Sequence, residues 1–470
     1  MKFDRVGLVG GLAADRPILT TLVLAFGLSA LATLGVSEAA GGAAFAIGDL
    51  LIAALLLVVA PLVIAGASPS KALFRIIIAL VIAGVVAGSL IYEPVLFTHL
   101  LRAPVFTLGA FVLATAILLG VGPLFGAMTK FSFIAASAAL LGMAGALGLL
   151  VQQGVEFSEK ASVIAIVAFI IAVIAGAGAL ADFAALYASG ADRRQASGLS
   201  VRRAIPSALN GAVAAALAFG LIPTMEKAGV PYLGALAGLS ACLCAAAALV
   251  ASAGALALRQ TSETMAVEEN RRRAAFRDKW RLLRGLFPPN ASLAIIAIAA
   301  IAVVAAAFNM PAQLPLSRLV FVILAAVVAG LVFFSLRAGV FVFFSLIVSA
   351  TIGGWLWGTF GGPVLSAFDQ AAALAIVAAL FGELAATWRD ARSPRLNARE
   401  TTQAAMTDGA GLHVFGVGLA LAGLCAGKAA GVYANALPTA GMLAVMAALG
   451  LLFAPPLMTA LSHVVRRELS

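Results

Sequence analysis

Charged residues are scarce in this sequence of 470 residues, because Asp, Glu, Lys and Arg make up 11% while hydrophobic residues make up 63%. A soluble domain has about a quarter of its residues charged, so this chain lacks the side chains that cover a globular surface in water. Its apolar residues gather in runs of about 20, which is long enough to cross a bilayer core as helices. The composition therefore predicts an all-α polytopic membrane protein.

Cysteine and histidine are also scarce, with three residues of each. The cysteines lie in apolar runs, where they form neither a disulfide framework nor a metal-ligand spacing. The histidines are widely separated, which argues against a transition-metal site, and no P-loop type of phosphate-binding sequence occurs. A membrane glycosyltransferase would need acids on a sizeable outer loop, and the predicted outer loops are short. We therefore expect no metal, no cofactor and no catalytic residues, and we interpret the chain as a protein that is not an enzyme.

Fourteen apolar runs are candidate membrane spans. They cover residues 17–36, 45–66, 72–92, 104–127, 131–151, 161–188, 205–225, 232–258, 291–308, 316–335, 338–358, 363–387, 409–427 and 437–460. With the N-terminus inside, 25 of the 30 Lys and Arg residues fall in inner segments, as the positive-inside rule requires. Both termini are thus predicted to be cytoplasmic. The net charge of +10 belongs to these inner segments and does not indicate nucleic-acid binding.

An acid inside an apolar run, followed by a basic loop, occurs twice. The first copy, Gly178–Ala204, reads GALADFAALYASGADRRQASGLSVRRA, and the second, Gly382–Ala405, reads GELAATWRDARSPRLNARETTQAA. Aligned without a gap, Asp182 falls on Glu383. Each copy continues through a further span to an outer loop with a Lys-Ala-Gly-Val pattern. This shared order predicts an internal repeat.

The repeat predicts two parallel six-helix units related by an axis along the membrane normal. Between them, residues 259–290 carry aromatic and leucine side chains at helical spacing among Arg and Lys, which is typical of a helix lying on an anionic membrane surface. We divide the chain into an N-terminal transmembrane hairpin (1–70), a first six-helix repeat (71–258), a cytoplasmic amphipathic linker (259–290) and a second six-helix repeat (291–470).

The sequence of Gly178, Asp182 and Phe183, with a basic inner loop and two closing helices after them, resembles the membrane half of the resistance-nodulation-division (RND) superfamily. The resemblance is to its lipid-exporting MmpL-like branch and covers about residues 72–460. It implies a proton-coupled secondary transporter, or the membrane motor of one, in the bacterial inner membrane. The implied substrate is lipid-like or amphipathic.

The chain departs from that family in two respects, the first of which is the additional N-terminal hairpin 17–66. Members carry a large extracytoplasmic porter domain after the first helix of each half, whereas these positions here are the short loops 93–103 and 309–315. The lipid bilayer and a lipid-like substrate are the expected partners, with a partner subunit supplying the extracytoplasmic domain. Two alternatives stay open: a non-transporting scaffold subunit of an envelope complex, and a fourteen-helix flippase for lipid-linked sugars.

Three residues are candidates for proton coupling. Asp182 lies eleven residues before Arg193, about 16 Å along a helix and therefore near mid-bilayer, where a charge costs about 2.5–3.5 kcal/mol. Glu383 lies six residues before Arg389, about 9 Å along a helix, and is expected to be the shallower partner. His413, in the thirteenth span, is a candidate proton relay. The structural alternatives are acids hydrogen-bonded within the bundle and a histidine that is merely packed.

Overall fold

The computed structural model describes residues 159–225, 232–256, 316–391, 398–429 and 433–464, together with isolated positions elsewhere. These segments form helices and contain no strand, so the all-α prediction is confirmed. The helices are α9 (Glu159–Ala188), α10 (Arg193–Met225), α11 (Tyr232–Leu256), α14 (Leu316–Val332), α15 (Leu336–Thr359), α16 (Ala367–Asp390), α17 (Ala398–Ala429) and α18 (Ala436–Val464).

Seven helices of the described segments are long and apolar enough to cross a membrane, and α14 is a shorter apolar helix. The protein is therefore a multi-pass membrane protein. The predicted hairpin 1–70, the loops 93–103 and 309–315 and the linker 259–290 lie outside the continuous described segments. The count of fourteen spans and the two-repeat division stay predictions.

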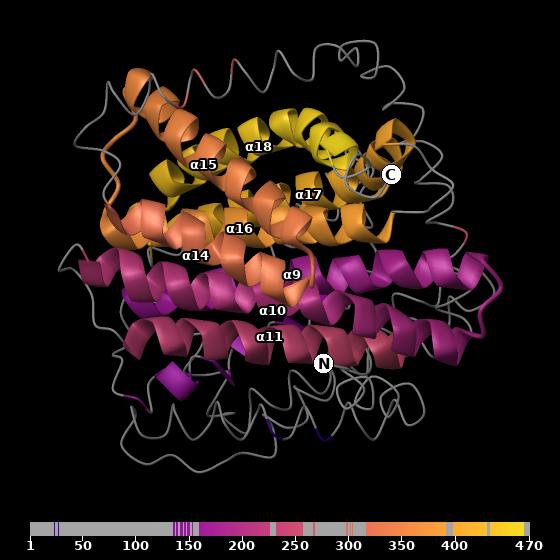
Figure 1. Cartoon of the computed structure of the whole chain (residues 1–470). Helices are drawn as coiled ribbons and strands as arrows, with labels where there is room; N and C mark the ends of the chain where they lie inside the picture. The colour runs from indigo at the N-terminus through magenta and orange to yellow at the C-terminus, as the bar shows by residue number, and fades with distance from the viewer. Residues whose placement is uncertain are drawn as a thin grey trace, which may run out of the picture.

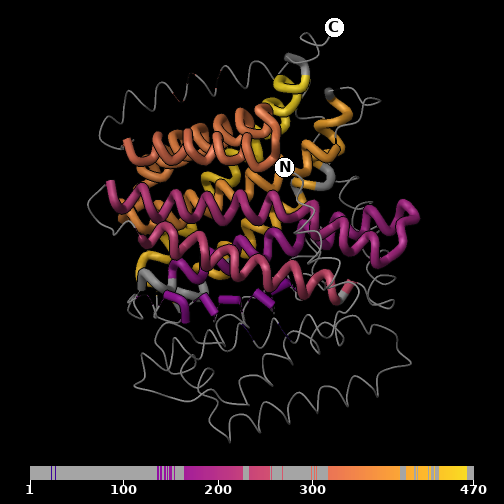
Figure 2. Tube along the Cα trace, turned by 60° about the horizontal axis from the view of Figure 1, so that its bottom comes forward, coloured from indigo at the N-terminus to yellow at the C-terminus, as the bar shows by residue number. Residues whose placement is uncertain are grey.

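The helices lie side by side in one bundle, with α9, α10 and α11 grouped together and α14 to α18 packed on them (Figures 1 and 2). Both α9 and α10 contact α16, and α17 contacts α9. The apolar stretch of α9 is 100% buried and that of α16 is 94% buried, more than in any other described span. The two helices that carry the predicted acids thus form the centre of the bundle.

The basic loop predicted after Asp182 is wrong, because most of it is helix. Gly190, with a φ of +93°, ends α9 in a short turn, a conformation that glycine adopts without strain. The side chain of Asp192 then accepts a hydrogen bond from the backbone N–H of Arg194 (3.1 Å), which is the usual way to start a helix. As a result α10 begins at Arg193, twelve residues before the predicted span, and α17 likewise begins at Ala398 rather than at 409.

Candidate functional site

The carboxyl group of Glu383 lies where three helices meet. It projects from α16, is 8% exposed, and accepts a hydrogen bond at Oε2 from the hydroxyl of Ser207 on α10. Ser207 is itself buried. A hydroxyl is a neutral partner, so this hydrogen bond holds the carboxyl group in place without supplying a compensating positive charge.

The third helix reaches Glu383 through a glycine. A Cβ atom placed on Gly178 of α9 would overlap Glu383 Oε1 and would lie 3.1 Å from Glu383 Cδ. A side chain at position 178 would therefore occupy the space that the carboxyl group fills. Small residues allow such close approach of membrane helices, and here the space admits a polar group of the neighbouring helix.

Asn210 is a second polar residue of α10 at this junction. It is 2% exposed, and its amide lies so close to Gly382 that a Cβ there would overlap Asn210 Nδ2. The same nitrogen makes a long hydrogen bond of 3.5 Å to the carbonyl of Ala378. Ser207 and Asn210 stand one turn apart on α10, so both face α16. Neither residue was predicted as part of the site.

Asp182 lies one helical turn beyond Gly178, toward the predicted inner end of α9. It is partly exposed, whereas Glu383 is buried, and it is close enough to Glu383 for its charge to act on that carboxyl group. The expected depth of Asp182 was counted from Arg193, but α9 ends at Ala188, six residues after Asp182, while α16 ends at Asp390, seven residues after Glu383. The two acids therefore lie at similar distances from the ends of their helices, and Asp182 is the less buried of the two.

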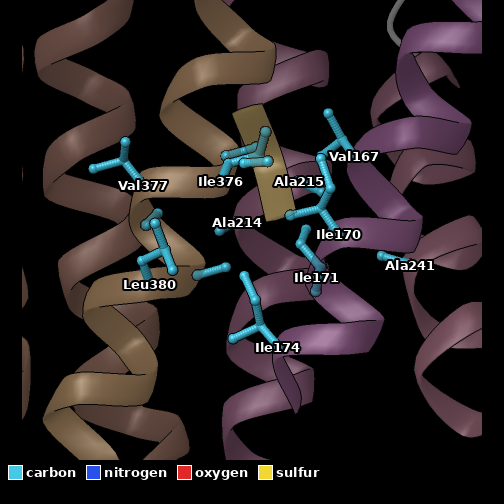
Figure 3. Packing of buried hydrophobic residues seen from close by; sticks show 14 of the residues in the cluster. Val167, Ile170, Ile171, Ile174, Ala214, Ala215, Ala241, Ile376, Val377 and Leu380 are labelled. Carbon is cyan, nitrogen blue, oxygen red and sulfur yellow. The ribbon is translucent and has the colours of Figure 1, made fainter. Parts of the chain in front are cut away.

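An apolar layer covers the other side of the site. Figure 3 shows Ile171 and Ile174 of α9 beside Ile376 and Leu380 of α16, each of them toward the predicted outer ends of their helices. All four are buried. Gly416 of α17 closes the layer, since a Cβ there would meet Leu380 and would lie 3.1 Å from Ile174 Cγ1. On this side of the site, the facing side chains of α9 and α16 are therefore apolar.

Toward the predicted inner end, α16 becomes polar. Arg389 donates to Asp390 in an ion pair of 2.8 Å, and its guanidinium lies 5.6 Å from the ring centroid of Phe333. The charges of Arg389 and Asp390 also act on Glu383. Charged side chains thus lie at this end of α16.

His413 lies on α17 in an apolar setting. It is 2% exposed, and its ring stacks on Phe381 with centroids 5.6 Å apart and an interplanar angle of 21°. The backbone of Leu380 and Ala447 lies near the ring, but neither ring nitrogen has hydrogen-bond geometry to a group in the described segments. The helix that carries His413, α17, packs against α16, which carries Glu383. The proton-relay role of His413 stays a prediction.

The groups that meet at this junction are of the kind that bind protons. Within the described segments no group of three or more His, Cys, Asp or Glu side chains could hold a metal ion. The junction brings together two carboxyl groups, a hydroxyl and an amide, contributed by α9, α10 and α16.

No protein-family model matches the sequence, and no curated protein matches it. Its structure is similar to that of SecDF from Thermus thermophilus, a translocon-associated membrane protein, with a TM-score of 0.50 and 15% identity over 80% of this chain and 64% of SecDF. The chain thus spans less than two thirds of that protein.

Two further structures are similar at lower scores. SecDF in its super-membrane-facing form has a TM-score of 0.47 and 13% identity over 77% of this chain and 63% of that one. The hedgehog release protein Disp from the water bear Hypsibius dujardini has a TM-score of 0.47 and 11% identity over 79% and 71%. The likeness to SecDF shows the class of fold, which is a helical membrane fold similar to that of SecDF.

Proposed function

We propose that the chain is a proton-coupled secondary transporter of RND-like type, or the membrane motor subunit of one, with Glu383 as the main proton-binding group. The observation that carries this proposal is the burial of Glu383 between Ser207 and Gly178, beside the second acid Asp182. Buried ionisable residues inside membrane bundles are expensive, and they commonly mark proton pathways.

A proton on Glu383 changes how α16 packs on its neighbours. A neutral carboxyl group fits the narrow space beside Gly178, with Ser207 as hydrogen-bond partner. An ionised one there requires water or a cation, because an unpaired charge in an apolar interior is costly. Loss of the proton therefore favours separation of α9 and α10 from α16, and this separation is the movement that transport requires.

The route of the proton follows from the position of the second acid. Asp182 is partly exposed and lies toward the predicted inner end, while the apolar layer around Ile174 and Leu380 lies on the outer side. We assign Asp182 the role of a relay between inner water and Glu383. In this conformation the site communicates with the cytoplasmic side, and another conformation must connect it to the outer side.

The substrate of this proposal is lipid-like or amphipathic, in a bacterial inner membrane with both termini cytoplasmic. The apolar character of the helices outside the junction supports it, because a hydrophilic substrate would need a polar path. The same proposal includes membership of the MmpL-like branch without its porter domains. It also includes a partner subunit that supplies an extracytoplasmic domain.

A second candidate is a membrane subunit that works inside a larger complex. SecDF is described as translocon-associated, and the similar fold favours an assembly partner for this chain as well. Stable co-purification with such a partner, together with full tolerance of Glu383→Gln, would select the scaffold role over transport. The lipid-linked sugar flippase is less favoured, because the fold likeness is to SecDF.

The proposal is tested by proton uptake into liposomes that contain the full chain and lipids extracted from its source membrane. A pH-sensitive dye inside the liposomes reports uptake after an acid pulse. The wild-type protein should take up protons and Glu383→Gln should not. Glu400→Gln is the matched control, because it makes the same substitution at an exposed acid in the first turn of α17. Equal uptake by wild type and Glu383→Gln would refute the proton-coupling role.

A further inference from the structure

A second buried carboxylate lies at the other end of α16. Asp369 is 3% exposed and belongs to the first turn of the helix, where it forms a capping box with Ser366. Its Oδ2 accepts hydrogen bonds from Ser366 Oγ (2.7 Å) and from the Ser366 backbone N–H (3.2 Å). Reciprocal bonds of this kind fix the start of a helix.

Two further donors come from another part of the chain. The hydroxyl of Tyr433 donates to Asp369 Oδ1 (2.6 Å), and Asn435 Nδ2 donates to Asp369 Oδ2 (2.9 Å). Both residues lie immediately before α18. Tyr433 is 1% exposed, and its hydroxyl also lies 2.8 Å from Thr439 Oγ1 in the first turn of α18. A single carboxylate therefore joins the start of α16 to the start of α18.

The same region includes the end of α15. The indole of Trp357 donates to the carbonyl of Pro363 in the α15–α16 turn (3.1 Å). It also fills the space beside Gly441 of α18, where a Cβ would lie 2.6 Å from the indole. The ends of α15, α16 and α18 thus meet at one place, and Figures 1 and 2 show the three helices in the same group.

The matching positions of the first half do not carry the same set of residues. Under the alignment that matches Asp182 with Glu383, Asp369 falls on Ala168 and Asn435 falls on Gly234. Tyr433 falls on Tyr232, but Tyr232 is 48% exposed. The tyrosine is present in both halves, whereas the buried carboxylate occurs in one. The contacts around Asp369 therefore distinguish α16 from α9.

We propose that Asp369, Tyr433 and Asn435 form an outer anchor that makes α15, α16 and the start of α18 one rigid unit. Hydrogen bonds to a carboxylate are stronger than those between neutral groups, and rigid units that turn against each other are the usual way in which transporters change access. With its outer end held, α16 serves as a fixed element past which α9 and α10 move. That last step rests on the proposed function, whereas the rigidity itself does not.

The anchor is tested by distances between spin-label pairs in the full chain, in a background in which Cys242, Cys244 and Cys425 are replaced. The first pair, Val364 and Leu437, lies within the proposed rigid unit, and both residues are exposed. The second pair, Val364 and Met225, joins the unit to the exposed outer end of α10. Each pair is measured by pulsed electron paramagnetic resonance.

Each pair is compared with and without Glu383→Gln, which mimics the protonated acid. The Val364–Leu437 distance should be narrowly distributed and equal in both cases. Tyr433→Phe, which removes one hydroxyl, should broaden it, and so should Asn435→Ala, which removes a different donor. Tyr232→Phe is the matched control and should leave the distribution unchanged.

Two results would overturn the anchor. One is a Val364–Leu437 distance that shifts when Glu383→Gln is introduced. The other is a distribution that stays narrow in both Tyr433→Phe and Asn435→Ala. A third result would separate the two proposals: the Val364–Met225 distance does not change with Glu383→Gln, but Tyr433→Phe broadens the Val364–Leu437 distribution. This result would support the rigid unit and contradict the proton-driven movement of the proposed function.

Discussion

Gly178 of α9 leaves open the space that the carboxyl group of Glu383 on α16 occupies. The two residues come from helices that are distant in sequence and adjacent at the centre of the bundle. Glycine in a membrane helix usually permits close packing of helices, and Gly178 also leaves room for a polar group. The following predictions depend on this relationship and on the contacts around it.

Gly178→Ala should destabilise the protein by about 1–3 kcal/mol, the usual cost of overpacking a well-packed interior. The added methyl group would overlap Glu383 Oε1. The control is Gly354→Ala on α15, where a Cβ meets nothing within 4 Å. Thermal unfolding in detergent measures both variants, and equal midpoints for the two would contradict the close approach of α9 and α16.

Ser207→Ala should cost about 1–3 kcal/mol, because it leaves a buried acceptor without its donor. Ser240→Ala is a matched control, since Ser240 is equally buried on α11 and its hydroxyl has no hydrogen-bond partner within the described segments. Equilibrium unfolding should therefore separate the two serine variants. If Ser240→Ala proves as destabilising as Ser207→Ala, the lost hydrogen bond to Glu383 does not explain the lower stability of Ser207→Ala.

Asp182→Asn should slow proton uptake by about tenfold or more, since a positioned proton-transfer group contributes at least that factor. It should not abolish uptake, because Glu383 remains the buried binding group. Rates in liposomes at several acid-pulse strengths distinguish a slower relay from a lost site. A variant that loses uptake entirely, as Glu383→Gln does, would show that the two acids share one role.

The relay role predicted for His413 can be separated from packing. His413→Phe removes both ring nitrogens and keeps an aromatic ring to stack on Phe381. If His413 relays protons, uptake should fall by about tenfold or more with an unchanged unfolding midpoint. Unchanged uptake would assign His413 to packing alone.

Parts of the fold and of the site follow directly from the sequence. Asp182 and Glu383 stand out because carboxyl groups are rare in apolar runs, and the structure brings their helices into contact. The relative depth of the two acids did not follow from the sequence, because each depth was counted along the chain from the acid to the next arginine. The end of α9 and a turn with a left-handed Gly190 lie between Asp182 and Arg193.

Ser207 and Asn210 carried a weaker signal. Serine is common in alanine-rich membrane helices, where its hydroxyl bonds to the helix backbone as readily as to a neighbour. Within the predicted span 205–225, Asn210 is the one residue with an amide side chain. Its position could have indicated which face of α10 packs against another helix. Which neighbouring helix it faces depends on packing between segments distant in sequence, and periodicity along one helix does not give that information.

If Glu383 binds and releases a proton at the junction of α9, α10 and α16, its carboxyl group should change its infrared absorption with pH. Infrared difference spectroscopy on the full chain in lipid, recorded across a pH titration, measures this change. We expect a protonated-carboxyl band that vanishes in Glu383→Gln and shifts in frequency in Ser207→Ala, where its hydrogen bond is lost. A band of undiminished intensity in Glu383→Gln would contradict proton binding by Glu383.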